Sequence, residues 1–160
     1  MRVNYAEAVY GKEEEKAVSK LLQSGGFLAG GKNTSEFEKQ IAKIFGKKFG
    51  VMVNSGSSAN LIALELLNLP RGSEIITPLL TFGTTLSPLL QKGLVPVFAD
   101  VLEGKYVIDT NQIEKLISKK TRALLIPYLM GNTPDLEKIK SIAKKHHLFV
   151  IGDSCDTLNA

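Results

Sequence analysis

The sequence is poor in the features that mark secreted, membrane and disulfide-bonded proteins. It has one cysteine, Cys155, among 160 residues, so no disulfide can form within the chain. It has no run of about 18 apolar residues, so no transmembrane helix is expected. The stretch Met1 to Tyr5 lacks the apolar segment of a signal peptide. Because a single cysteine also suits a reducing compartment, these features predict a cytoplasmic protein with no membrane partner.

Charge of one sign is not concentrated anywhere in the chain. The formal net charge is +4, but Lys and Arg are interspersed with Asp and Glu, and the densest charged run, Lys12–Lys16, is of mixed sign. A protein that binds nucleic acid needs a basic stripe to neutralise phosphates, so no nucleic-acid partner is expected. The length and the 44% hydrophobic content are sufficient for one domain with a sizeable core.

Apolar strands and amphipathic helices alternate through most of the sequence. Apolar runs bounded by turn residues predict strands at 49–54, 74–77, 95–101, 121–127 and 148–151. Periodic apolar residues predict helices at 12–23, 58–67 and 84–92. Three more helices are predicted with their N-caps. One is capped by Ser35 together with Glu38, one by Asp109 or Thr110, and one by Thr133 before Pro134. Strands that are apolar throughout are covered on both faces, which predicts an α/β fold with a mostly parallel sheet and helices on both faces. Pro96 cannot donate to a sheet ladder, so its strand is expected at an edge.

Three loops should lie beyond the carboxyl ends of the strands, where parallel sheets bind ligands. In Ser55-Gly56-Ser57-Ser58, backbone N–H groups, hydroxyls and the dipole of the next helix can bind a phosphate, or Ser57 can simply cap that helix. Asp153, which follows the last strand, can meet a ligand or cap the next segment. In the segment 81–85, Phe82 can stack on a planar ligand or pack in the core.

Other reactive side chains have simpler explanations. Cys155 has no identifiable partner and is expected to be a small buried apolar residue rather than a nucleophile. His146 and His147 follow two lysines at a helix end, where solvated cations are favourable. No group of His, Cys, Asp or Glu has metal-ligand spacing, so no metal site is expected.

Taken in order, these loops resemble the first part of a DegT/StrS-type nucleotide-sugar aminotransferase, a fold-type I enzyme that depends on pyridoxal 5′-phosphate (PLP). The resemblance runs from Asn4 to Ala160. The stretches that carry it are Gly25–Leu28, Gly30-Gly31, Glu36–Glu38, Asn54–Ala59, Gly93–Val101, Gly131-Asn132, Asp135-Leu136 and Asp153–Leu158. It implies that residues 1–160 form the N-terminal portion of the three-layer large domain of this fold.

The resemblance assigns a role to each residue at the strand ends. Gly56, Ser57 and Ser58 would hold the cofactor phosphate. Phe82 would stack on the pyridine ring, and Asp153 would pair with the ring nitrogen. A carboxylate there keeps the nitrogen protonated, and a protonated ring is the better electron sink.

The chain departs from the family pattern at several positions around these residues. Asp156 stands where a family side chain, often Gln, reaches the 3-oxygen of the ring. Gly152 stands where Glu is common, Gly83 where Pro or Ala is usual, and Tyr128 where His is common. Each difference would reshape the pocket, but none removes a main cofactor contact.

The resemblance implies two possible reactions. Family aminotransferases bind PLP covalently through a lysine that follows the strand bearing the aspartate. A sister branch has histidine there, uses pyridoxamine 5′-phosphate (PMP), and dehydrates C3 of a 4-keto-6-deoxy sugar nucleotide. Neither residue occurs in its position up to Ala160, so we expect a fragment that is inactive alone. The residues of the motifs are somewhat closer to the dehydratase branch, but the two reactions are nearly balanced, and the general expectation is an aminotransferase-family enzyme.

The resemblance also implies partners for a full-length enzyme. They are a nucleotide-sugar substrate used in polysaccharide or glycoside biosynthesis, an amino donor such as glutamate, and a second copy of the chain in a homodimer. The alternative of another class is a non-catalytic relative that acts as a sensor or binds a partner.

Overall fold

A computed structural model describes residues 7–26 and 28–158. The chain divides into two units, Met1–Met52 and Val53–Ala160. Some residues named in the sequence analysis lie outside the described residues, namely Met1 to Tyr5, Phe27 and Ala160. Among the residues that are described, no helix has the length and apolarity needed to cross a membrane.

The first unit contains helices α1 (Lys12–Gln23) and α2 (Lys32–Ile44). The bounds of α1 match the prediction. The capping box predicted at Ser35 is wrong, because α2 begins at Lys32 and Gly31 is its N-cap. Ser35 lies within the first turn and donates its N–H to Gly31 O at 3.0 Å. The carboxylate of Glu38 instead accepts the N–H of Met52 at 2.8 Å.

The segment 49–54 is not the strand that its apolar residues predict. It pairs with no other strand of the described chain, and Phe49 and Val51 are 75% and 71% exposed. An apolar run forms a strand only where another strand satisfies its backbone groups. The sequence pattern shows that these residues are apolar, but it does not show whether a neighbouring strand is present to pair with them.

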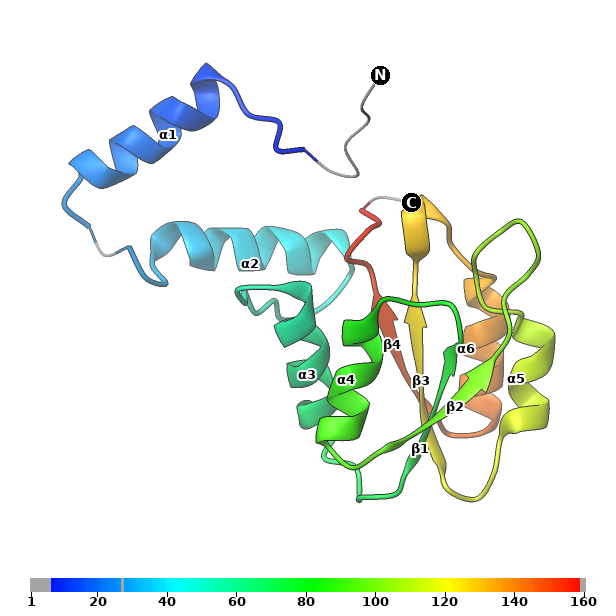
Figure 1. The fold of residues 1–160 in the computed structure, drawn as a ribbon. Helices are drawn as coiled ribbons and strands as arrows, with labels where there is room; N and C mark the ends of the chain where they lie inside the picture. The colour runs from blue at the N-terminus through cyan, green and yellow to red at the C-terminus, as the bar shows by residue number, and fades with distance from the viewer. Residues whose placement is uncertain (1–6, 27, 159–160) are drawn as a thin grey trace. The chain divides into compact units, whose positions relative to one another are not determined.

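The second unit is built on a four-stranded parallel sheet (Figure 1). Its strands are β1 (Glu74–Pro78), β2 (Val95–Ala99), β3 (Thr121–Pro127) and β4 (Phe149–Asp153), in the order β2-β1-β3-β4. The strand that contains Pro96 is therefore at an edge, as predicted. The strand predicted at 95–101 ends early, and Val101 instead forms an isolated antiparallel bridge with Ile108.

Helices cover both faces of this sheet, as Figure 1 shows. On one face lie α3 (Gly56–Leu66) and α4 (Gly83–Gln91), and on the other lie α5 (Thr110–Leu116) and α6 (Leu136–Lys145). The core on the first face consists of Leu64, Ile75, Leu89, Leu94, Ala123 and Leu125. The core on the second face includes Ile76, Ile113, Leu124, Ile126, Ile139 and Ile142. Successive strand residues enter opposite cores, which confirms the three-layer α/β prediction.

The N-caps of two helices differ from those expected. Ser55, rather than Ser57, caps α3, and its Oγ accepts the N–H of Ser58 at 3.2 Å. Asp135, rather than Thr133, caps α6 by accepting the N–H of Lys138 at 2.9 Å. Asp109 caps α5, in agreement with one of the two residues predicted for that position.

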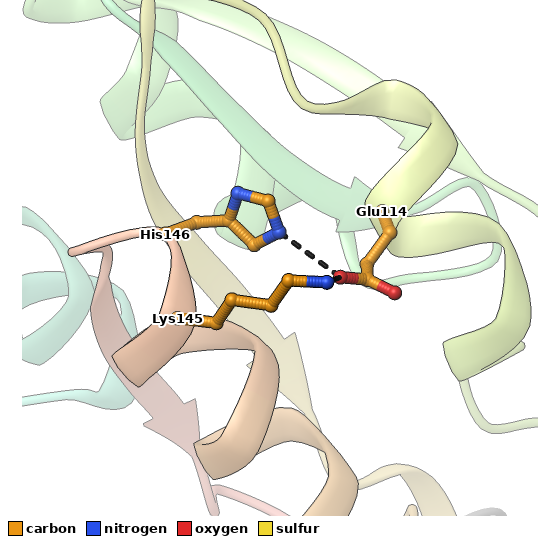
Figure 2. Close-up of polar contacts among 3 residues, drawn as sticks. All are labelled: Glu114, Lys145 and His146. Carbon is orange, nitrogen blue, oxygen red and sulfur yellow. Dashed lines mark hydrogen bonds and ion pairs between the residues drawn. The ribbon is translucent and has the colours of Figure 1, made fainter.

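A small ionic cluster joins the ends of α5 and α6 (Figure 2). One carboxylate oxygen of Glu114 accepts a hydrogen bond from Lys145 Nζ at 2.8 Å and lies 3.0 Å from His146 Nε2. His146 thus lies at the C-terminal end of α6, as its sequence position indicated, and its ring also contacts the neighbouring helix while 29% of the side chain stays exposed. The hydrogen bond from Lys145, and next that from His146, lower the pKa of Glu114 below its ordinary value.

This cluster predicts an acid-sensitive contribution to stability. Because the pKa of Glu114 is lowered in the folded state, the contribution is fully present above the ordinary value of 4.5 and is lost as the pH falls through the lowered pKa. The difference in free energy of unfolding between the protein and Glu114→Gln, measured by urea denaturation, should therefore shrink as the pH is lowered through this range. The exposed Glu103→Gln serves as the control for charge, and a difference that is the same at pH 7 and pH 3 would contradict the prediction.

Candidate functional site

The strand order places a candidate site beyond the carboxyl ends of β1 and β3. From β1 the chain continues to β2, toward one edge of the sheet, and from β3 it continues to β4, toward the opposite edge. The order therefore reverses between β1 and β3, and open parallel sheets bind ligands at such a reversal. The segment after β1 contains Phe82, and Asp153 ends β4, the strand next to β3.

Asp153 is held by donors from two helices and from its own turn. Its Oδ2 accepts hydrogen bonds from Asn60 Nδ2 of α3 at 2.8 Å and from Thr85 Oγ1 of α4 at 3.2 Å. Its Oδ1 accepts the N–H of Cys155 at 3.2 Å. Asn60 and Thr85 are buried, with 6% and 1% of their surface exposed. The carboxylate thus lies on the α3–α4 side of the sheet, fixed from several directions.

The start of α3 carries hydrogen-bond donors that have no acceptor among the described residues. Ser55 caps the helix through the N–H of Ser58, but in the described part of the chain nothing accepts a hydrogen bond from the N–H of Gly56 or of Ser57. The Ser57 hydroxyl likewise has no protein partner among the described residues. Free N–H groups at the positive end of a helix dipole are suited to an anion such as a phosphate.

Gly56 packs closely against the side chain of Cys155. A Cβ atom there would lie 2.8 Å from Cys155 Sγ, closer than such atoms approach. Cys155 thus connects the start of α3 with the turn that follows Asp153. The thiol-bearing residue is exposed, not buried as expected from its sequence, because it lies at the open end of the sheet rather than inside a layer.

The remaining sequence-predicted residues lie at the same end of the sheet with fewer contacts. Phe82 is the N-cap residue of α4 and is 69% exposed, so it is not part of the core. Its carbonyl accepts the N–H of Thr85, which links it to the helix turn that contacts Asp153. Asp156 is exposed in the turn after β4, where the described residues offer it no hydrogen bond.

Tyr128 follows β3 and is packed against the strand that bears Asp153. Its N–H donates to Asp153 O at 2.9 Å, and a Cβ atom at Gly152 would lie 2.5 Å from its Oη. Burial raises the pKa of Tyr128 above its ordinary value, against a weaker opposing effect of Lys140. The Tyr128 hydroxyl is therefore neutral at neutral pH and can act as a donor.

Asn60, Thr85 and Thr157 are site residues that were not predicted from the sequence. The Thr157 hydroxyl donates to Tyr128 O at 2.6 Å and accepts the N–H of Gly131, so it ties the turn after β4 to the end of β3. A polar residue on an otherwise apolar helix, such as Asn60 in α3, is the signal that could have indicated one of them. No signal in the sequence pairs either helix residue with Asp153.

The residues present fit a phosphorylated pyridine cofactor. Unused N–H donors and hydroxyls at a helix start suit a dianionic phosphate. A fixed carboxylate suits a protonated ring nitrogen. Within the described residues, no three His, Cys, Asp or Glu side chains form a group that could hold a metal ion.

Comparisons with known proteins identify the family of the chain. Residues 9–160 match the model of the DegT/DnrJ/EryC1/StrS aminotransferase family. A dTDP-4-dehydro-2,6-dideoxy-D-glucose 3-dehydratase of Saccharopolyspora spinosa is 40% identical over 83% of this chain, which spans 30% of that protein. A dTDP-3-amino-3,6-dideoxy-alpha-D-galactopyranose transaminase of Aneurinibacillus thermoaerophilus is 32% identical over 90% of this chain, which spans 39% of it.

The same family is found among solved structures. The crystal structure of a GDP-4-keto-6-deoxymannose-3-dehydratase with a trapped PLP–glutamate geminal diamine aligns with a TM-score of 0.91 and 32% identity. The alignment covers 99% of this chain and 42% of that one. The chain therefore spans less than half the length of each of these relatives. It belongs to the DegT/DnrJ/EryC1/StrS aminotransferase family and has the fold of its PLP-dependent relatives.

Proposed function

We propose that this chain holds PLP or PMP between the start of α3 and the end of β4. Gly56, Ser57 and Ser58 bind the phosphate, and Asp153 pairs with the ring nitrogen. The observation that carries the proposal is the Asp153 carboxylate, which two buried donors fix at the strand end next to the unused N–H groups of α3. Phe82 stacks on the ring, which accounts for a large apolar side chain left 69% exposed at this end of the sheet.

The chemistry follows from what each residue does to the bound group. The cofactor, when bound, supplies an electron sink for the bonds that are broken next to the reacting nitrogen. Asp153 holds the proton on the ring nitrogen, which maintains that capacity. The N–H groups of Gly56 and Ser57 fix the phosphate, so that the ring keeps one position during the reaction. Asp156 is the side chain assigned to the 3-oxygen of the ring.

The enzyme to which the chain belongs acts on a keto-deoxy sugar nucleotide for polysaccharide or glycoside biosynthesis. The first candidate reaction is amino transfer to this sugar, with an amino acid such as glutamate as donor, in keeping with the aminotransferase family whose model the chain matches. The relatives support the substrate class, because the names of the dehydratase and the transaminase both specify deoxy sugars linked to a nucleotide. Residues 1–160 form the N-terminal portion of the large domain of that enzyme.

Dehydration at C3 of the sugar is the second candidate. It is supported by the 40% identity to a 3-dehydratase, against 32% to the transaminase, and by the TM-score of 0.91 to a second 3-dehydratase. The dehydratase requires PMP rather than a cofactor attached to lysine. In the complete reading frame, lysine at the cofactor-attachment position would therefore predict amino transfer, and histidine would predict dehydration.

Product analysis tests these proposals. The protein expressed from its complete reading frame is incubated with PMP or PLP, glutamate and a 4-keto-6-deoxy sugar nucleotide, and the products are analysed by mass spectrometry. An amino sugar nucleotide indicates amino transfer, and a sugar nucleotide that has lost its C3 hydroxyl indicates dehydration. A protein that binds the cofactor but leaves the sugar unchanged would instead support the non-catalytic alternative, a sensor or partner-binding protein.

A cytoplasmic homodimer is proposed for the complete enzyme on the resemblance to the family. The exposed apolar side chains of α1, Val18 and Leu22, are 58% exposed each and are available for contact with another chain. Light scattering of the purified protein gives its mass directly. A monomer at working concentration would contradict the dimer.

A further inference from the structure

The Asp153 carboxylate lies at the junction of three elements. It ends β4, and it faces the layer in which α3 and α4 pack against each other and α3 packs against β4. Each helix contributes one side chain to it, Asn60 from the second turn of α3 and Thr85 from the first turn of α4. Both side chains reach the same oxygen, Oδ2, although they are 25 residues apart in the chain.

The hydrogen bonds divide the two carboxylate oxygens into different roles. Each oxygen of an ionised carboxylate can accept about two hydrogen bonds. The amide of Asn60 and the hydroxyl of Thr85 together occupy the two sites of Oδ2. The N–H of Cys155 occupies one site of Oδ1. One acceptor site therefore remains, and it belongs to Oδ1.

We propose that Asn60 and Thr85 are positioning residues that saturate Oδ2 of Asp153 and so present Oδ1 to the ring nitrogen of the cofactor. This inference rests on the proposed function, because it assigns a supporting role at the same site. Both side chains are almost completely buried, so water does not compete for Oδ2. Without them the carboxylate could rotate, and its unpaired oxygen would no longer be fixed next to the ring.

The variants that test this remove one donor at a time. Thr85→Val keeps the shape of the buried side chain and removes its hydroxyl, whereas Thr85→Ser keeps the hydroxyl. Asn60→Leu removes the amide at similar volume. Thr110→Val is the matched control, because Thr110 is also a buried threonine at the start of a helix but is in α5, on the other face of the sheet.

The readout is the protonation of the ring nitrogen of bound PMP, labelled with ¹⁵N at that atom and followed by NMR as the pH is raised. The protein is expressed from its complete reading frame. Thr85→Val and Asn60→Leu should each lower the pKa of the ring nitrogen by about one unit, a tenfold change in the protonation equilibrium. Thr85→Ser and Thr110→Val should leave it unchanged. Tyr128, Cys155 and Asp156, the ionisable groups near Asp153 in the segment after β3 and in the turn after β4, are the same in all of these variants.

The outcomes separate the two proposals. If Asp153→Asn lowers the pKa of the ring nitrogen but Thr85→Val and Asn60→Leu do not, the positioning role is wrong and the proposed function stands. If PMP does not bind, or if Asp153→Asn also has no effect, the proposed function is wrong.

A second measurement requires no cofactor. NMR couplings of the Asp153 side chain should show one rotamer in the protein and in Thr85→Ser, and averaging between rotamers in Asn60→Leu with Thr85→Val. The same NMR spectra also identify a variant that fails to fold. A single rotamer in the folded double variant would overturn the inference.

Discussion

Replacing Asp153 with asparagine is expected to lower kcat by about 10²–10³-fold, the usual cost of removing one group that stabilises charge during catalysis. Asparagine has nearly the same shape, and its oxygen can still accept the hydrogen bonds that Asn60 and Thr85 donate. It lacks the negative charge that holds a proton on the ring nitrogen. The loss should therefore appear mainly in kcat, while binding of the cofactor phosphate at α3 is retained.

Steady-state kinetics on the product of the complete reading frame measure this effect. Asp100→Asn is the matched control, because Asp100 also follows a strand of the sheet but its carboxylate accepts, among the described residues, only the N–H of Val101 at 2.8 Å. An unchanged kcat in Asp153→Asn, with cofactor bound, would contradict the role assigned to Asp153.

Gly152→Ala is expected to lower the free energy of unfolding by about 1–3 kcal/mol, the usual cost of overpacking. The added Cβ would lie 2.5 Å from Tyr128 Oη and 3.0 Å from its Cζ. Gly152 does not have a positive φ, so the cost arises from lack of space and not from backbone strain. Urea denaturation measures the change.

A double-mutant cycle attributes this cost to Tyr128. Removing only the hydroxyl, in Tyr128→Phe, should relieve the cost of Gly152→Ala in part, because Cζ remains close. Removing the ring, in Tyr128→Leu, should relieve it almost completely. An equal cost in all three backgrounds would contradict the explanation. The pair also accounts for two departures from the family pattern together, since the Tyr128 ring occupies the space in which a side chain at 152 would begin.

The sheet was predictable from sequence because its residues are buried on both faces. The run Ala123–Ile126 is completely buried in β3, and its lack of alternation indicated both covering layers. Pro96 indicated the edge because a missing N–H has the same consequence in any parallel sheet. The strand predicted at 49–54 failed, because pairing depends on a neighbour that local sequence does not specify.

The candidate site was only partly predictable for a related reason. Gly56, Ser57 and Asp153 lie in short motifs whose chemistry is local. Asn60 and Thr85 act through contacts with Asp153 that span 93 and 68 residues of sequence. Their helices had to be placed on the same face of the sheet before the three side chains could be related. The N-caps predicted at Ser57 and Thr133 were wrong because several residues suited to capping follow one another at each place.

A crystal structure of the protein with PMP tests the central claim most directly. The account predicts that the phosphate accepts hydrogen bonds from the N–H groups of Gly56 and Ser57 at the start of α3. It also predicts that the ring nitrogen lies within hydrogen-bond distance of Asp153 Oδ1. PMP bound elsewhere, or a site still empty at saturating PMP, would contradict the account.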